Sequence, residues 1–296
     1  MIVVFGSINL DLIFPLSDLP APGETVLGPD LRQEPGGKGA NQALAASRDG
    51  ADVVMAGAVG RDALADAALV LLREQGVDLT RVIQTDATTG CAGIAVDPAG
   101  NNAICVGSGA NLLARADQVE DALLGPSTTL LLQMEVPVEE NARLAARARR
   151  FGARVILNLA PACEVTLETL RQLDLLLVNE TEASWIARHF GSAADAASLH
   201  TALDIGIVRT LGGRGVEAAD ATGHVQLPAC RVTAVDTTAA GDCFAGVLAA
   251  ALDRGASLPA ALTRANVAAA RCCTRAGSQT SIPHASETEA HMATNT

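Results

Sequence analysis

The chain has 296 residues, enough for one large α/β domain or two smaller ones. Hydrophobic residues make up 49% of it, which fits a globular protein and argues against disorder. The formal net charge of −12 disfavours nucleic acid as a partner, because a phosphate backbone needs a basic surface. The chain has no apolar run long enough to suggest a membrane span, and no signal-like basic segment precedes the apolar residues 2–5. We therefore expect a cytoplasmic protein without a membrane partner.

Two proline- and glycine-rich segments interrupt the first third of the chain. Residues 11–37 contain five prolines and several glycines, and residues 88–108 predict a strand, a turn at 97–100 and a second strand. Both patterns indicate short β-strands rather than helices. Around them the apolar pattern predicts, in chain order, a buried strand at 2–5, a helix at 40–50, a strand at 52–58 and a helix at 63–75.

From residue 129 onwards, predicted strands and helices alternate to the end of the chain. This alternation predicts an α/β fold with a mostly parallel central sheet and helices on both faces. The strands are expected near 129–134, 154–159, 174–178 and 205–210, with helices between them and further helices at 240–253 and 258–275.

The two β-rich segments are separated in the sequence but alike in character. We expect them to pair as a small second sheet, which would form a lid over the sheet edge where α/β proteins bind ligands. This interpretation divides the chain into an α/β core of residues 1–10, 38–87 and 109–296 and a β lid of residues 11–37 and 88–108.

Residues 236–242, Asp-Thr-Thr-Ala-Ala-Gly-Asp, run directly into a predicted helix. The small side chains leave the first backbone N–H groups of that helix free to face a ligand, and the helix dipole favours an anion there. Gly241 lets the backbone approach a phosphate closely, and Asp242 would lie within reach of a hydroxyl that attacks phosphorus. The segment alone leaves a second interpretation open, in which Asp242 only caps the helix.

A second glycine-rich segment, residues 36–39, surrounds Lys38, the only lysine of the chain beside twenty arginines. Three glycines within four residues ahead of a helix predict close contact between the backbone and another group. A compact ammonium group fits where a guanidinium does not. The spacing is not that of a Walker A loop, and no GxGxxG motif follows a strand. The alternative is a plain turn, which would leave Lys38 and Asn41 without a role.

Polar side chains follow several of the predicted strands. Asn9 and Asp11 are two residues apart on one side of an extended chain and suit the vicinal hydroxyls of a sugar; an Asx turn is the alternative. Glu135 follows a second strand, residues 179–182 a third, and the glycine-rich residues 210–215 a fourth. Because the carboxyl ends of parallel strands meet at one sheet edge, these groups predict a ligand site there.

Together and in this order, the motifs resemble the ribokinase branch of the PfkB carbohydrate kinase family. The resemblance extends over essentially the whole chain, and the motifs GGKGAN and DTxAAGD are highly specific. It rests on GSINLD, PAPGETV, GGKGANQ, GSGAN, LLQMEVP, LNLAPA, NETEA, TLGGRG, VDTTAAGD and TRAGSQTSIP. It implies a ribokinase-like three-layer sandwich with a small β-sheet lid.

Residue roles follow from this resemblance, position by position. Asp242 looks like the general base, with the backbone N–H groups of Ala239, Ala240 and Gly241 as an anion hole. The implied sugar-binding set is Asn9, Asp11, Gly37, Lys38, Gly39, Asn41, Glu135 and Asp242. The implied ATP-binding set is Asn179, Thr210, Gly212, Gly213, Arg214, Gly215, Gly241 and Asn266.

The resemblance also implies two kinds of cation. Glu182 is similar to an acid that organises Mg²⁺ through water. A site for an activating monovalent cation, K⁺, is matched by Asp236 and Thr238, with later contributions, mainly from backbone carbonyls, by Cys272, Arg275, Gly277 and Ser281.

The implied function is transfer of the γ-phosphoryl group of ATP to the primary (5-) hydroxyl of D-ribose, giving ribose 5-phosphate. Sister kinases for fructose, 2-keto-3-deoxygluconate or a nucleoside are the nearest alternatives, and GGKGANQ favours ribose. A non-catalytic sugar or nucleotide sensor on the same scaffold is a second class, and a dinucleotide oxidoreductase a third. Exposed apolar positions on the lid strands further suggest a homodimer through lid–lid packing.

Overall fold

Within residues 1–294, which a computed structural model describes, nine strands form one twisted central sheet. Their order is β13-β12-β11-β10-β9-β8-β1-β4-β5, and every pairing is parallel except the two made by β12. The strands are β1 (Ile2–Phe5), β4 (Val53–Gly60), β5 (Asp78–Thr85), β8 (Thr129–Leu132), β9 (Arg154–Asn158), β10 (Leu175–Val178), β11 (Gly206–Thr210), β12 (Val216–Asp220) and β13 (Gly223–Leu227).

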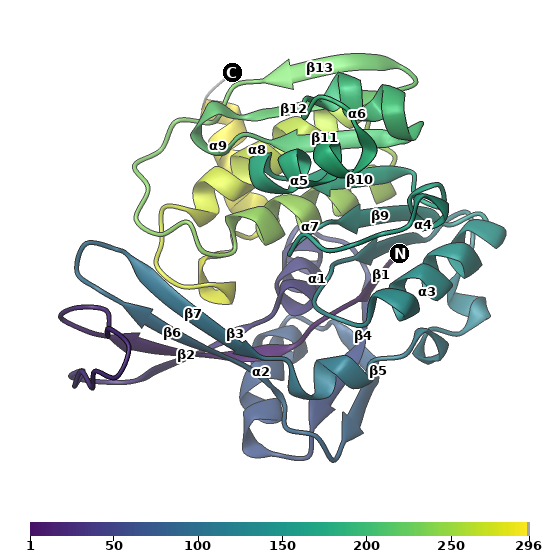
Figure 1. The fold of residues 1–296 in the computed structure, drawn as a ribbon. Helices are drawn as coiled ribbons and strands as arrows, with labels where there is room; N and C mark the ends of the chain where they lie inside the picture. Colours follow the sequence, from purple (N-terminus) through teal and green to yellow (C-terminus); the bar gives the residue numbers. More distant parts are fainter. Residues whose placement is uncertain (295–296) are drawn as a thin grey trace.

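Helices cover both faces of this sheet, so the molecule has three layers (Figure 1). Helices α1, α2, α7 and α8 pack on one face, while α3, α5 and α6 pack on the other. The helices are α1 (Lys38–Arg48), α2 (Ala63–Glu74), α3 (Val138–Arg150), α4 (Leu167–Leu170), α5 (Glu180–Phe190), α6 (Ala196–Leu203), α7 (Ala240–Asp253), α8 (Leu258–Cys272) and α9 (Ala285–Thr294). The predicted α/β fold class is confirmed.

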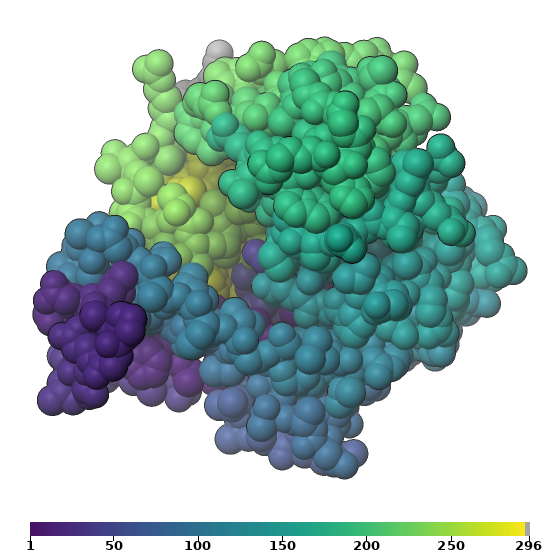
Figure 2. All heavy atoms as spheres, in the orientation of Figure 1, coloured from purple at the N-terminus to yellow at the C-terminus, as the bar shows by residue number. Residues whose placement is uncertain are grey.

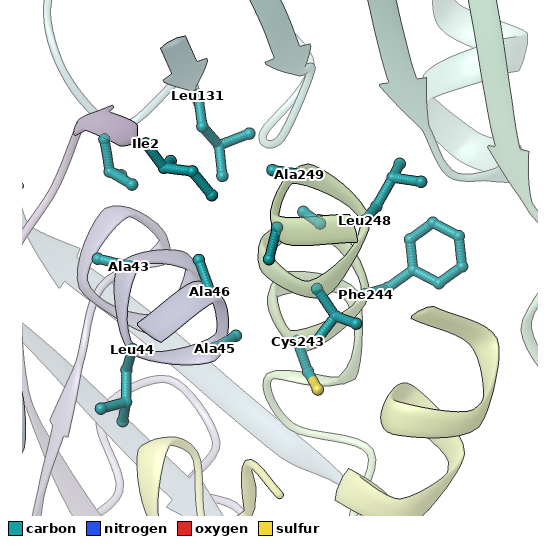
Figure 3. Packing of buried hydrophobic residues seen from close by; sticks show 14 of the residues in the cluster. Ile2, Ala43, Leu44, Ala45, Ala46, Leu131, Cys243, Phe244, Leu248 and Ala249 are labelled. Carbon is teal, nitrogen blue, oxygen red and sulfur yellow. The ribbon is translucent and has the colours of Figure 1, made fainter. Parts of the chain in front are cut away.

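Strand β1 shows why the sheet must be covered on both faces. All four of its residues are fully buried, and successive side chains point to opposite faces: Ile2 and Val4 belong to one hydrophobic core, Val3 and Phe5 to the other. On the first face Ile2 lies above α1 and α7, which present mostly alanines to the strands (Figure 3). Small side chains at this contact allow both helices to approach the sheet closely.

The two β-rich segments pair with each other in a separate four-stranded sheet, as predicted. Its order is β3-β2-β6-β7, with β2 and β6 parallel although they belong to different segments. The small sheet projects from one side of the core and stands beside the C-terminal half of the chain (Figures 1 and 2). Its strands are β2 (Asn9–Pro15), β3 (Arg32–Gly36), β6 (Gly90–Val96) and β7 (Asn102–Gly107).

Four elements differ from the sequence-based expectation. Strands β12 and β13 form an antiparallel hairpin after β11, so the predicted strand–helix alternation is wrong there. Strand β5 and helix α9 carry no clear apolar period and were not expected. The half-exposed pattern of β5 fits its place at the sheet edge, where only one side is paired.

Among residues 1–294, the structure holds no helix with the length and apolar character that a membrane crossing needs.

Candidate active site

Asp242 lies in the first turn of α7, and its side chain reaches across to α1. Its Oδ2 accepts a hydrogen bond from Nδ2 of Asn41 at 2.9 Å, and its Oδ1 accepts one from Nε2 of Gln42 at 2.9 Å. The N-cap residue of α7 is Ala239, in the left-handed region at φ 59°, and no side chain caps the helix. Asp242 is therefore not the capping residue of α7. The Ala240 N–H already donates to the Thr237 carbonyl at 3.3 Å, so the predicted anion hole depends on the N–H groups of Ala239 and Gly241.

The glycine-rich segment before α1 packs against the turn between β1 and β2. Gly37 has φ 88°, and a Cβ atom on Gly39 would lie 2.6 Å from the backbone nitrogen of Ser7. The Ala40 N–H donates to the Ser7 carbonyl at 2.9 Å. The predicted close backbone contact is thus present, and it fixes where α1 begins, with Asn41 facing Asp242 one turn in.

The polar residues predicted to bind the sugar lie where the small sheet joins the central sheet. Asn9 and Asp11 are buried residues of the extended strand β2, which excludes the Asx turn. Oδ1 of Asn9 accepts from Nδ2 of Asn111 at 2.7 Å. Glu135 accepts two hydrogen bonds at its Oε2, from Oγ of Ser7 at 2.6 Å and from the Lys38 backbone N–H at 3.1 Å. Glu135 therefore lies against the start of α1, close enough to Asp11 for their charges to interact.

Electrostatic coupling connects these groups with Asp242. Burial raises the pKa of Asp11 to about 7, and the negative charges of Glu135, Glu34 and Asp242 add to the rise. The pKa of Lys38 is raised chiefly by Asp242, against the effect of its own burial. One ammonium group thus balances several buried carboxylates. Such a site suits a neutral ligand with hydroxyl donors, and it needs cations if a polyphosphate is to bind beside it.

Two cavities meet at the start of α7. A smaller one of about 240 Å³ lies beside Lys38 and Asp242, and a larger one of about 570 Å³ lies between α7, α8 and the loop after β11. Thr210, Thr237 and Gly241 line both. The smaller cavity holds the predicted residues Lys38, Asn179, Glu182, Thr210, Ala239, Gly241 and Asp242, and the larger holds Thr210, Gly212, Gly213, Gly215, Ala240, Gly241 and Asn266.

Other predicted nucleotide and Mg²⁺ residues are already engaged with the protein. Asn179 and Glu182 form a reciprocal capping box at the start of α5, with 2.8–3.0 Å between their bonded atoms. Burial raises the pKa of Glu182. Arg214 pairs with Glu180, and the larger cavity is lined by its glycine neighbours instead. Nδ2 of Asn266 donates to the Pro228 carbonyl at 2.7 Å, at the edge of that cavity.

The residues proposed for a monovalent cation gather around Asp236. Its Oδ1 accepts from the Thr238 backbone N–H at 2.8 Å and its Oδ2 from the Gly277 N–H at 3.0 Å. Burial acts to raise the pKa of Asp236, but these hydrogen bonds outweigh it, so the pKa lies below its usual value. Sγ of Cys272 lies 3.8 Å from the Thr238 carbonyl and 3.0 Å from Oγ of Ser281. Arg275 directs its guanidinium away, to Glu287. Apart from Arg275, the residues predicted for this site therefore lie close together, and the Asp236 carboxylate is the hard oxygen ligand among them.

Several residues of the site were missed from the sequence. Asn158 lines the smaller cavity at the end of β9, and the rule of polar groups at strand ends could have found it. Gln42 follows the predicted Asn41, but its contact with Asp242 spans 200 residues of sequence. The outer wall of the larger cavity comes from a loop without a motif and from one face of α8: Ala229, Cys230, Arg231, Val232, Ala234, Ala269, Ala270 and Cys273.

Fold and site together define an enzyme that binds a hydroxyl compound beside a nucleotide-sized cavity, with a carboxylate at the helix mouth between them. This is the arrangement of a small-molecule kinase. The chain belongs to the pfkB family of carbohydrate kinases, whose sequence profile matches residues 1–285.

Known relatives point to one branch of that family. The chain is 35% identical to a ribokinase of Haemophilus influenzae, over 97% of this chain and 96% of that protein. Its fold is similar to the crystal structure of ribokinase from Thermotoga maritima, with a TM-score of 0.92, 33% identity and 99% of both chains covered. It is also similar to Arabidopsis thaliana ribokinase complexed with ribose and ATP, with a TM-score of 0.87, 27% identity and 98% of both chains covered. The resemblance predicted from the motifs is confirmed.

Proposed function

We propose that the protein phosphorylates the 5-hydroxyl of D-ribose with ATP, giving ribose 5-phosphate. The observation that carries this proposal is the position of Asp242, which Asn41 and Gln42 hold beside the smaller cavity and within electrostatic reach of Asp11 and Lys38. A relative solved with both ribose and ATP supports the choice of the two substrates.

In the proposed reaction, ribose lies against Asp11, Lys38 and Asn41 with its primary hydroxyl toward Asp242. The carboxylate accepts the hydroxyl proton as the oxygen attacks the γ-phosphorus. Negative charge on the transferring group is stabilised by the backbone N–H groups of residues 239–241 at the start of α7 and by the Lys38 ammonium. ADP leaves with the electron pair of the broken P–O bond.

Cations complete the site. Mg²⁺ neutralises phosphate charge when it is bound, and Glu182 would hold it through water, because its carboxylate lines the smaller cavity while accepting bonds from Asn179. K⁺ would lie beside the Asp236 carboxylate, in the loop that leads into α7. Since that loop also carries residues 239–241, a cation there would fix the backbone donors that face phosphate.

We expect ADP formation to depend strongly on ribose in a panel of pentoses, hexoses, nucleosides and 2-keto-3-deoxygluconate, and to rise when Na⁺ is exchanged for K⁺. A coupled assay at equal ionic strength measures both effects. Faster turnover of fructose or a nucleoside would change the proposed substrate from ribose, while the assignment as a kinase would stand. Binding of sugar and nucleotide by calorimetry without turnover on any substrate would favour a sensor. Equal rates in Na⁺ and K⁺ would contradict activation by K⁺ and leave the kinase proposal standing.

We propose further that the small sheet acts as the lid, with residues 11–37 and 88–108 as its boundaries, and that two chains pair through it. The support is the set of exposed apolar side chains on the small sheet: Ile104 and Val106 are 58% and 53% exposed on one face, and Phe14 is 39% exposed on the other. We also propose a cytoplasmic enzyme that does not bind nucleic acid, consistent with its net charge of −12.

The dimer proposal predicts that Ile104→Glu lowers the mass in solution from about twice the 30.1 kDa of one chain to that of a single chain. A charge buried in an apolar interface is costly, and β7, the edge strand of the small sheet, is exposed along its whole length in one chain. Light scattering after gel filtration measures the mass. Phe151→Glu, at an apolar position at the end of α3 that is 39% exposed, is the control. A wild-type protein that runs as a monomer would contradict the proposal.

A further inference from the structure

One fully buried polar side chain contacts Asp242 from behind. Gln42, on α1, has no exposed surface, and its Nε2 lies between two acceptors: Oδ1 of Asp242 at 2.9 Å and Oδ1 of Asn158 at 3.0 Å. Its own Oε1 has no hydrogen-bond partner among the described residues. A buried amide that leaves its oxygen unpaired in order to place its nitrogen between two acceptors needs an explanation.

The orientation of the Gln42 amide follows from that of its neighbour Asn158, which in turn is fixed by a backbone carbonyl. The Leu177 carbonyl, on β10, can only accept, and Nδ2 of Asn158 donates to it at 3.3 Å. Oδ1 of Asn158 must therefore face Gln42. Both Nε2 hydrogens of Gln42 are then committed, one to Asn158 and one to Asp242. A relay of amides thus connects the central sheet to the carboxylate.

Close packing of α1 and α7 keeps this relay in place. A Cβ atom on Gly246 would lie 2.4 Å from the Gln42 carbonyl oxygen and 2.7 Å from Cβ of Ala45, so the two helices touch at backbone distance. Gln42 and Asp242 consequently have little freedom to move apart. The other carboxylate oxygen, Oδ2, accepts a hydrogen bond from Nδ2 of Asn41.

We propose that Gln42 is the positioning residue of the phosphoryl-transfer reaction: it fixes the Asp242 carboxylate through Oδ1, so that Oδ2 faces the hydroxyl of the sugar. This proposal rests on the proposed function, in which Asp242 is the base. Gln42 does not touch the substrate. Its effect is on the orientation of the base, and a carboxylate that is free to rotate loses the alignment with the attacking hydroxyl.

Gln42→Met tests the proposal, because methionine has a similar length and no hydrogen to donate. We expect kcat for the preferred sugar to fall roughly 10- to 100-fold, the effect of one bond to a charged group, with KM for sugar and ATP changed less than about threefold. In an Asp242→Asn background the same substitution should cost no more than about twofold in kcat, since there is no base left to position. Gln42→Asn, which keeps an amide but is too short to reach both acceptors, serves if the methionine variant does not fold.

Gln118→Met is the matched control, since Nε2 of Gln118 also donates twice, to the carbonyls of Gly57 at 2.7 Å and Arg81 at 2.8 Å, outside both cavities. It should lower the melting temperature and leave kcat unchanged. Unchanged kcat in a folded Gln42 variant, or an equal loss in the Asp242→Asn background, would overturn the proposal. If Asp242→Asn itself keeps full turnover, the proposed base is wrong, which is a different result.

Discussion

Asp242→Asn should lower kcat for the sugar roughly 10²- to 10⁴-fold, the usual contribution of a general base, and leave sugar affinity nearly unchanged. The amide has the shape of the carboxylate and can still accept one bond from Asn41 or Gln42. It cannot take the proton of the attacking hydroxyl. Steady-state rates with saturating ATP, together with sugar binding by calorimetry, separate the two effects.

The control for this prediction is another aspartate at a helix start. Asp195 caps α6, with its Oδ1 accepting from the Ser198 N–H at 2.9 Å. Asp195→Asn should change stability by less than about 1 kcal/mol, because asparagine caps nearly as well, and leave kcat as it is. Undiminished turnover in Asp242→Asn would mean that the proton leaves by another route, and the role of Asp242 would have to be withdrawn.

The parts of the site that could be predicted from the sequence have a local cause. Gly37 and Gly39 were conspicuous because only glycine tolerates the backbone contact they make with the β1–β2 turn. Asp11 and Glu135 stand at strand ends, where the parallel sheet brings polar groups together. The apolar runs of β1, β8 and β10 are continuous because both faces of these strands are covered.

The parts that could not be predicted depend on packing between distant segments. The Gln42–Asp242 bond requires α1 and α7 to touch at Gly246, and nothing in either helix sequence states this. Strand β5 has a half-exposed pattern because it is an edge strand, so its apolar period is weak. The wall of the larger cavity is made of small and mixed side chains from a loop, which fit many structures equally well.

The sugar side of the site carries a cost in stability that can be measured at Asp11. Asp11→Asn should weaken ribose binding about 10- to 100-fold, by removing a charged acceptor, and should stabilise the ligand-free protein near pH 8. The pKa of Asp11 is raised from 3.8 to about 7 by burial, and by Glu135, Glu34 and Asp242. This difference corresponds to ~4 kcal/mol of destabilisation at most, and each 1 kcal/mol recovered should raise Tm by about 2–4 °C.

The sign of the pH dependence follows from which state holds the proton. Between pH 3.8 and about 7 the folded protein keeps the Asp11 proton that the unfolded chain has released, so the penalty is complete above pH 7 and shrinks as the pH falls toward 4. The stability gain of Asp11→Asn should therefore be large at pH 8 and vanish near pH 4. Melting curves of the wild type and of Asp11→Asn across this range measure the difference. An Asp11→Asn gain that is equal at both ends of the range would mean that Asp11 is not the group that titrates, and a variant with undiminished ribose affinity would remove it from the sugar site.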